Sequence, residues 1–319
     1  MKAIVYYDYG SPEVLKLVDL DKPVPADDEV LIKIHAASVN PLDWRMMSGS
    51  PFVLRLLSLR GPKIKRPGVD FAGQVEAVGK DVTRLKPGDA VFGACQGSFA
   101  EYACTKESKV AIKPENVSFE DAASAPIAAL TALQALRDHG RVQAGQRVLI
   151  NGAAGGVGTF AVQIAKSFGA EVIGVCSTRN VELVRSLGAD RVTDYTREDF
   201  AKSGERYDIL FDNMGNHSLS ASRRVLKAHG RGVIVGGPKN IWIIFAHALQ
   251  AVVFSWFVSQ RFGMMMAKMN SEDLATIGDL IASGRVKPVI DRRYSLSEVP
   301  DAMRYSEEGH ARGKVIITI

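Results

Sequence analysis

Hydrophobic and polar residues follow a strand-like pattern through about the first 120 residues. Val30–Ala36 alternates apolar and polar side chains, and Met1–Tyr7, Asp70–Val78 and Ser98–Cys104 also have the character of β-strands. Pro87–Phe92 begins with a turn and continues as a strand. Frequent glycine and proline between these short segments predict an irregular, barrel-like β domain.

From Ser118 the pattern changes to alternating helices and strands. The alanine-rich segment Phe119–Leu136 predicts one helix, with Glu120 and Asp121 near its start. Strand and helix patterns then follow one another at Val148–Asn151, Gly156–Phe168, Glu171–Cys176, Val181–Leu187, Arg191–Thr193, Tyr207–Asn213, Leu219–Leu226 and Gly232–Gly236. This alternation indicates a parallel, doubly wound sheet.

The last part of the chain returns to β character. A helix is predicted at Glu272–Ser283, and short strands are predicted at Val289–Ile290 and Val315–Ile319. We expect this tail to fold back onto the N-terminal domain.

One segment, Ile241–Phe257, is unusually apolar. His247, Gln250 and Ser255 interrupt it, and it is short for a transmembrane helix, so no integral membrane span is expected. It fits a buried helix that lines a substrate cleft or a subunit interface, or an amphipathic element on a membrane surface. Lys and Arg are absent from residues 241–260, which favours the buried helix and leaves peripheral membrane contact open.

Length and composition indicate a two-domain protein of a reducing compartment. The chain has 319 residues, too many for one ordinary core, and its three cysteines fit neither a disulfide framework nor a zinc knuckle. The N-terminus enters a strand without a signal or transit peptide, which predicts a cytoplasmic location. The net charge of +5 is mild, and the basic cluster of residues 55–66 lacks interleaved aromatic residues, so nucleic-acid binding is not expected.

The segment Arg147–Gly158 carries the most specific chemistry. It has the pattern of a buried strand, a glycine-rich turn and the start of a helix, and the strand Glu171–Cys176 follows that helix. The turn contains Ala153-x-Gly155-x-x-Gly158, with alanine in place of the usual first glycine. Gly155 would let the backbone approach a pyrophosphate, which the helix N-terminus attracts, and Gly158 would allow close packing. The sequence therefore predicts a dinucleotide site.

The residues after the second strand favour NADPH over NADH. Ser177, Thr178 and Arg179 stand where NAD sites carry an acid for the ribose, and no carboxylate occurs before Glu182. Hydroxyl and guanidinium groups can hydrogen-bond a 2′-phosphate, which an acid would repel. Ser177 and Thr178 could also simply cap the helix Val181–Leu187.

Several motifs together resemble the zinc-independent branch of the medium-chain dehydrogenase/reductase superfamily, the quinone oxidoreductase and enone reductase group. They are Ala37–Asp43, Pro67–Gly73, Leu85–Phe92, Ala129–Ala132, the glycine turn, Leu187–Asp190 and Gly313–Val315. The resemblance implies an α/β protein with three parts. These are the first part of a GroES-like β-rich catalytic domain (residues 1–122), a Rossmann domain (123–262) and a return segment that completes the catalytic domain (263–319).

The residues at the zinc positions argue against a metal. Zinc members of the superfamily place a cysteine where Asn40 stands, and Gly-His-Glu where this chain has Gly68-Val69-Asp70. Val69 cannot ligate zinc, and no cysteine occurs between Cys104 and Cys176 to supply a third ligand. We therefore expect no metal site.

The resemblance also implies roles for single residues. Asn40 and Thr131 should lie near the nicotinamide. Alternatively, Asn40 could serve only as a cap of the turn before Pro41. The residues expected at the cofactor are Gly155, Gly156 and Val157 at the pyrophosphate, Ser177, Thr178, Arg179 and Tyr195 at the 2′-phosphate, and Gly236 and Gly237 at a strand end. Tyr195 could instead serve only in packing.

The acceptor site departs from the family pattern. Arg45 stands where a tyrosine often follows the Asn-x-x-Asp motif, so Arg45, Met46, Met47 and Trp242 are expected to define the acceptor pocket. Without a Lewis acid, hydride transfer is easier to a conjugated enone or a quinone than to an isolated ketone.

The resulting hypothesis is a zinc-independent, NADPH-dependent reductase of enones or quinones. The six scattered histidines supply no clear general acid, which leaves the proton donor open. A largely non-catalytic NADPH-binding protein that associates with a partner or a membrane is an alternative, and a secondary-alcohol dehydrogenase is another. Relatives commonly dimerise through the edge of the Rossmann sheet, so a homodimer is expected.

Overall fold

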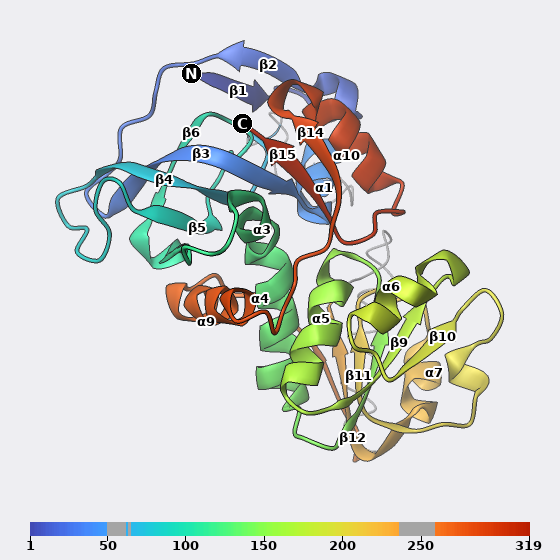
Figure 1. The fold of residues 1–319 in the computed structure, drawn as a ribbon. Helices are drawn as coiled ribbons and strands as arrows, with labels where there is room; N and C mark the ends of the chain where they lie inside the picture. Colours follow the sequence, from blue (N-terminus) through green and yellow to red (C-terminus); the bar gives the residue numbers. More distant parts are fainter. Residues whose placement is uncertain (50–61, 63–64, 236–258) are drawn as a thin grey trace. The chain divides into compact units, whose positions relative to one another are not determined.

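The computed structural model describes residues 1–49, 62, 65–235 and 259–319. The chain forms two compact units (Figure 1). The first contains Met1–Leu130, Lys268–Gly284 and Pro288–Ile319, and the second contains Thr131–Ala267 with Arg285–Lys287. The sequence placed the boundaries after residues 122 and 262; in the structure they fall after Leu130 and Ala267.

The first unit is built on a seven-stranded, mostly antiparallel sheet. Its order is β14-β15-β3-β4-β5-β7, and β6 pairs with β3 off this path. The strands are β3 (Glu29–Val39), β4 (Asp70–Val78), β5 (Ala90–Ala94), β6 (Tyr102–Lys106), β7 (Val110–Ile112), β14 (Ile290–Ser295) and β15 (Lys314–Thr318), with β1 (Lys2–Val5) and β2 (Lys16–Asp19) forming a separate hairpin-like pair. This confirms the GroES-like β-rich domain.

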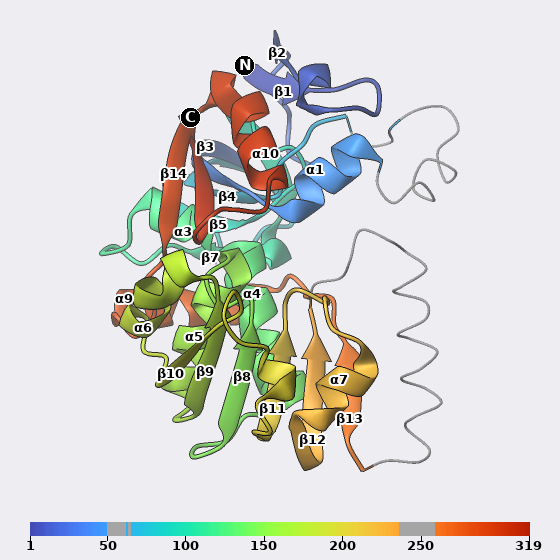
Figure 2. The ribbon, with the colours of Figure 1, turned by 90° about the vertical axis from the view of Figure 1, so that its right-hand side faces the viewer.

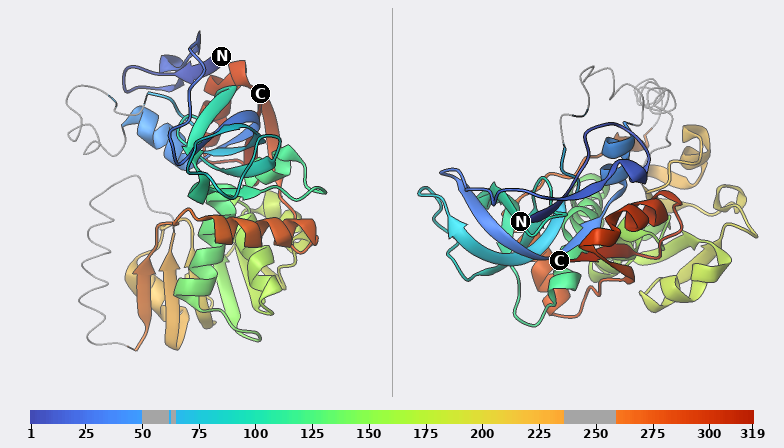
Figure 3. Two further views of the ribbon diagram at one scale, coloured as in Figure 1. Left: turned by 90° about the vertical axis from the view of Figure 1, so that its left-hand side faces the viewer. Right: turned by 90° about the horizontal axis from the view of Figure 1, so that it is seen from above.

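The end of the chain joins this sheet. Strand β15 runs antiparallel to β3, with Val315 opposite Val39, so residues from the two ends of the sequence become direct neighbours. The N- and C-termini both lie in the first unit (Figure 3). The fold therefore places residues near position 40 beside residues near position 314.

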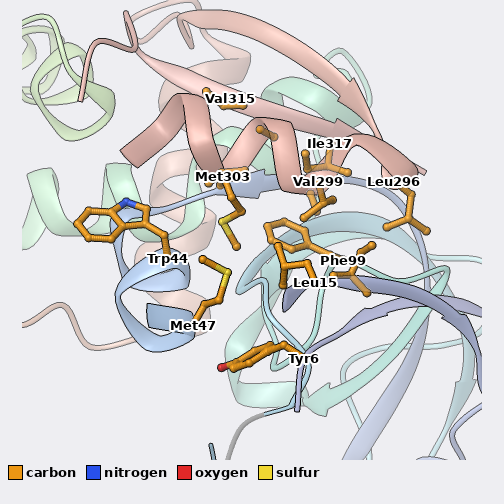
Figure 4. Packing of buried hydrophobic residues seen from close by; sticks show 14 residues of the cluster. Tyr6, Leu15, Trp44, Met47, Phe99, Leu296, Val299, Met303, Val315 and Ile317 are labelled. Atoms are coloured by element: carbon orange, nitrogen blue, oxygen red, sulfur yellow. The ribbon is translucent and has the colours of Figure 1, made fainter. Parts of the chain in front are cut away.

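A hydrophobic cluster lies between the sheet and the helices α1 (Pro41–Ser48) and α10 (Val299–Glu307). Figure 4 shows Met303 of α10 directed towards Met47 of α1, and Val299 beside Phe99. All four side chains are fully buried. Helix α10, which the sequence analysis missed, thus closes this core, and truncating Met303 to alanine should cost about 2–5 kcal/mol.

The helix predicted at Phe119–Leu136 is wrong as a single element. The structure has α3 (Phe119–Ser124), α4 (Pro126–Gln134) and a π-helical turn η3 (Ala135–Gly140). The break falls at Ala125 because Pro126 has no N–H for the preceding helix and is well suited to the first position of a new one.

The second unit contains a six-stranded, fully parallel sheet of order β10-β9-β8-β11-β12-β13. When the six strands are numbered by their order along the chain, their order in the sheet is 3-2-1-4-5-6. This is the Rossmann arrangement, so the predicted Rossmann domain is confirmed. The strands are β8 (Arg147–Asn151), β9 (Glu171–Cys176), β10 (Arg191–Asp194), β11 (Tyr207–Asp212), β12 (Leu226–Ile234) and β13 (Arg261–Met264), the last of which the sequence analysis missed. Helix α5 (Gly156–Ser167) packs on β8 and β9, α6 (Val181–Ser186) on β10, and α7 (Leu219–Arg224) on β12 (Figure 2).

Of the remaining elements, helix α9 (Ser271–Ala282) matches the predicted helix at Glu272–Ser283 and packs on β7. Across the described residues, no helix is long and apolar enough to cross a membrane. The apolar segment Ile241–Phe257 lies outside the described residues.

Candidate functional site

The glycine-rich turn joins β8 to α5 in a tight backbone arrangement. Gly152 adopts a φ of 86°, in the left-handed region, and the Gly155 N–H donates to the Gly152 carbonyl at 3.2 Å. A Cβ on Gly158 would stand 2.0 Å from the Gly152 carbonyl oxygen and 2.8 Å from the Ala153 backbone. Position 158 must therefore be glycine for the helix to start this close to the turn.

Gly155, by contrast, has space around it. A Cβ there would meet nothing nearer than the Gly152 carbonyl oxygen at 3.7 Å. Gly155 is the N-cap of α5 and has no side chain to bond the first-turn N–H groups of the helix. These N–H groups and the helix dipole fit an anionic group, so the turn matches the pyrophosphate of a dinucleotide.

The residues expected at the 2′-phosphate lie where β9 and β10 end. The Ser177 hydroxyl accepts from Asn180 Nδ2 at 3.2 Å, which leaves its own O–H as a donor, and Tyr195 is 62% exposed. Thr178 Oγ1 is already committed, because it donates to Asp194 Oδ2 at 2.6 Å. That hydrogen bond lowers the pKa of Asp194, so the carboxylate stays ionised beside Thr178.

Two buried polar residues that the sequence analysis missed organise the carboxyl ends of β8 and β11. Asn151 Nδ2 donates to Asp212 Oδ1 at 2.8 Å, and the same oxygen accepts from the N–H groups of Met214 and Gly215. The signal in the sequence was a polar residue that ends each of two apolar strands. The pair fixes the loop that follows β11. This loop lies beside the glycine turn, because the Met214 side chain is next to Gly152.

The first unit contains a buried polar cluster around Asp70. Asp70 Oδ2 accepts from Ser38 Oγ at 2.9 Å, from Asn40 Nδ2 at 2.9 Å and from Lys314 Nζ at 3.3 Å. Lys314 Nζ also donates to Asn40 Oδ1 at 2.7 Å. The side chains of Lys314 and Asp70 are only 3% and 0% exposed, so this is a fully buried ion pair. We call these four residues, Ser38, Asn40, Asp70 and Lys314, the Asp70 cluster.

Asn40 has two functions in this geometry. Its main chain begins α1 in a capping box, in which Asp43 Oδ2 accepts from the Asn40 N–H at 2.7 Å. Its side-chain amide is bonded at both ends, to Lys314 and to Asp70. The amide orientation is therefore fixed, and its oxygen is bonded to a cation.

Asp43 is buried next to the cluster. Burial raises the pKa of Asp43 to about 7, and the charge of Asp70 adds to this effect, although the N–H groups of Asn40 and Gly68 and the charge of Lys314 oppose it. Gly68 N donates to Asp43 Oδ1 at 3.2 Å. One carboxylate thus ties the start of α1 to the chain segment that leads into β4.

The residues at the zinc positions do not fit zinc. Val69 offers no donor atom, the Asn40 amide oxygen is occupied, and the ammonium of Lys314 would repel a divalent cation beside Asp70. Within residues 1–49, 62, 65–235 and 259–319, no group of three or more His, Cys, Asp and Glu side chains is arranged to hold a metal ion.

The other expected site residues fall in different places. Thr131 in α4 is 8% exposed, and its hydroxyl has no hydrogen-bond partner within the described part of the chain. Arg45 is half-buried, with its guanidinium 5.3 Å from the Trp44 ring centroid, and burial lowers its pKa. Met47 is 0% exposed and packs in the core, so it has no surface to offer an acceptor. Trp242, Gly236 and Gly237 lie outside the described residues.

Comparison with known proteins places this architecture in a family. The profile of the alcohol dehydrogenase GroES-like domain matches residues 26–115, and that of zinc-binding dehydrogenase matches residues 187–317. The second description names a metal that the residues of this chain do not fit.

Three similar proteins narrow the group. The 2-methylene-furan-3-one reductase of Solanum lycopersicum is 38% identical and aligns with 99% of this chain and 79% of its own length. The NADPH-dependent alkenal/one oxidoreductase, chloroplastic, of Arabidopsis thaliana is 36% identical over 99% and 79%. The solved structure of the quinone oxidoreductase from Coxiella burnetii superposes with a TM-score of 0.88 at 35% identity, covering 100% of this chain and 99% of that one. The chain therefore belongs to the medium-chain dehydrogenase/reductase superfamily, in its quinone oxidoreductase and enone reductase group, and is an oxidoreductase.

Proposed function

We propose that this protein is a zinc-independent reductase that uses NADPH to reduce a conjugated enone or a quinone. The observation that carries the proposal is the Asp70 cluster. The buried ammonium of Lys314 is held by Asn40 and Asp70, which stand where zinc members of the superfamily carry a cysteine and a glutamate. The side chains at these positions do not supply a zinc ligand set, which supports hydride transfer without a Lewis acid.

This restriction selects the substrate class. Bound NADPH would supply a hydride, with its electron pair, from C4 of the nicotinamide. In an enone, such a hydride would add to the β-carbon, the C=C electron pair would form a double bond between the α-carbon and the carbonyl carbon, and the C=O pair would move to the oxygen. The resulting enolate would take a proton from solvent or a cofactor hydroxyl. The conjugated system spreads this charge, and an isolated ketone cannot do so. The names of the Arabidopsis and Coxiella relatives agree with this class.

The chain's own residues would bind and orient the cofactor. The first-turn N–H groups of α5, beyond Gly155, would hold the pyrophosphate, with Gly156 and Val157 beneath it. The Ser177 hydroxyl, the Arg179 guanidinium and the exposed Tyr195 would bind the 2′-phosphate. The Thr131 hydroxyl is unpaired in the described structure and so can bond the nicotinamide carboxamide. Because the Asn40 amide is bonded at both ends, we assign Asn40 to positioning α1 rather than to proton transfer.

Turnover assays test the proposal directly. The protein should oxidise NADPH in the presence of methyl vinyl ketone or menadione, followed at the nicotinamide absorbance band, and should do so more slowly with NADH. No turnover across a panel of enones and quinones, with tight NADPH binding retained, would favour the non-catalytic alternative. Oxidation of isopropanol with NADP⁺, together with tightly bound zinc, would favour a secondary-alcohol dehydrogenase.

Two further expectations belong to the proposal. Within the described residues, β13 is one of the two edge strands of the parallel sheet, β10 being the other, and its outer backbone groups would be available to a homodimer. The cytoplasmic location expected from the sequence stays a prediction, because the Arabidopsis relative is named as chloroplastic.

A further inference from the structure

A pocket in the second unit lies at the opposite end of the sheet from the glycine turn. Its volume is about 370 Å³, and it is lined by residues that precede β8 (Arg141, Gln143 and Gln146), Asp208 at the start of β11, and His229 and Arg231 of β12. All strands of this sheet run parallel, so this is their amino end, whereas the glycine turn follows the carboxyl end of β8. The five residues of β8 put about 16 Å between the two sites.

Positive charge gathers at this pocket. Arg141 and Arg231 line it, and Arg261 of β13 is the register partner of Arg231 on the adjacent strand, so their side chains lie on the same face of the sheet. Among the described residues, none of the three guanidinium groups forms a hydrogen bond or an ion pair. Burial lowers the pKa of Arg231, and the charges of Arg141 and Arg261 lower it further, as expected for a cation that lies close to two others.

The acidic group in the pocket does not neutralise these arginines. Asp208 Oδ2 accepts from Lys227 Nζ at 2.8 Å and from the Arg147 N–H at 2.9 Å. Its charge is therefore paired with Lys227, and the pocket keeps a surplus of positive charge. Like charges on neighbouring strands are destabilising, so a pocket of this kind favours a ligand that brings negative charge.

The backbone gives an independent indication. Among the described residues, Arg141 (φ 51°) and His229 (φ 66°) are the non-glycine residues with a left-handed backbone, and both line this pocket. The left-handed conformation is energetically unfavourable for any residue that has a Cβ, whereas glycine adopts it without this cost. Strain of this kind is concentrated at binding and active sites, where the side chain is needed in place.

We propose that this pocket binds a small, free phosphate-bearing anion. Guanidinium groups match the geometry of phosphate oxygens in paired hydrogen bonds, which fits a site with two arginines in its wall and a third beside it. A volume near the lower end of the range for small-molecule pockets fits a compact, highly charged ligand. The proposal does not depend on the activity proposed above, because none of these residues belongs to the cofactor site.

Isothermal titration calorimetry with inorganic pyrophosphate tests this inference. The cofactor site is first saturated with NADPH, and sodium chloride of equal ionic strength is titrated as a control. Pyrophosphate should bind the wild-type protein, and Arg231→Gln and Arg141→Gly should each weaken binding about tenfold or more. Arg141→Gly should also leave the melting temperature unchanged or raised, because glycine relieves the left-handed backbone, so its loss of binding cannot be attributed to misfolding.

A matched control comes from a second basic pocket in the same unit. Arg224 lines that pocket together with Arg206 and Arg223, so Arg224→Gln removes the same charge from a different arginine group. Pyrophosphate affinity should be unchanged in this variant. The inference is overturned if pyrophosphate does not bind NADPH-saturated protein beyond the sodium chloride control, or if Arg224→Gln weakens binding as much as the pocket variants do.

Discussion

The glycine turn and the Asp70 cluster are built in opposite ways. The turn uses backbone groups within the short segment Gly152–Gly158. Its proposed role in binding a pyrophosphate requires glycine, which has no side chain to block the backbone. The Asp70 cluster uses side chains from three separated parts of the chain, and Lys314 and Asn40 are 274 positions apart. The first is a local motif that sequence pattern reveals. The second exists only after β15 has paired with β3.

The two sites should therefore respond differently to mutation. Removing a charge from the Asp70 cluster should damage stability first, because the partner charge is left buried. Adding a methyl group to the glycine turn should damage cofactor binding first, because it blocks the approach of an anion. The predictions below test this contrast.

The largest effect is expected from Lys314→Met. The variant leaves Asp70, which is 0% exposed, without its cation, and breaking a buried pair in this way costs about 3–5 kcal/mol of unfolding free energy. Urea denaturation measures the loss. The double variant Asp70→Asn with Lys314→Met removes both charges and should recover part of the lost unfolding free energy. If Lys314→Met alone stays within about 1 kcal/mol of wild type, the pair contributes little to stability.

The next effect concerns pH. Because burial raises the pKa of Asp43 from its usual 3.8 to about 7, the folded protein holds this proton more tightly than the unfolded chain. The stability from this group is present below pH 3.8 and is lost as pH rises from 3.8 to about 7, at up to about 1.4 kcal/mol per pH unit.

Urea midpoints between pH 5 and pH 8 test this assignment. Asp43→Asn should lose this downward trend relative to wild type, whereas Asp301→Asn, at an exposed position, should keep it. Identical pH profiles for wild type and Asp43→Asn would show that Asp43 titrates normally.

A smaller change in stability but a clear change in binding is expected at the glycine turn. Gly158→Ala places a Cβ 2.0 Å from the Gly152 carbonyl oxygen, so the turn must shift, and NADPH affinity should fall about tenfold or more. Gly155→Ala has room in the free protein and should fold with wild-type stability, yet it should also bind NADPH more weakly. Unchanged NADPH affinity in both variants would show that the pyrophosphate does not bind at this turn.

The smallest effect is a shift in cofactor preference. Ser177→Ala combined with Arg179→Gln should weaken NADPH binding by about tenfold and leave NADH binding almost unchanged, because only NADPH carries the 2′-phosphate. Fluorescence titration of both cofactors measures the ratio. Equal losses of affinity for NADPH and NADH would show that these residues contact a part of the adenosine that both cofactors share, and not the 2′-phosphate.

The same contrast explains what could be predicted from the sequence. The strand Glu171–Cys176 and the turn before α5 were placed correctly, because their signals are local periodicity and glycine spacing. Lys314 was noted only as part of the Gly313–Val315 motif, because nothing in its sequence neighbourhood indicates a contact with Asp70. Helix α10 and strand β13 were missed because both are short and depend on long-range packing. Met47 was assigned to the acceptor pocket from its position beside Arg45, but its side chain faces the core.

The central claim is that this protein transfers hydride to a conjugated carbonyl compound without a metal, and one measurement tests it most directly. Turnover of NADPH with methyl vinyl ketone is recorded before and after dialysis against a strong chelator, with zinc quantified by elemental analysis on the same samples. We predict equal rates in both samples and a zinc content far below one ion per chain. Loss of turnover on chelation that added zinc restores would contradict the claim.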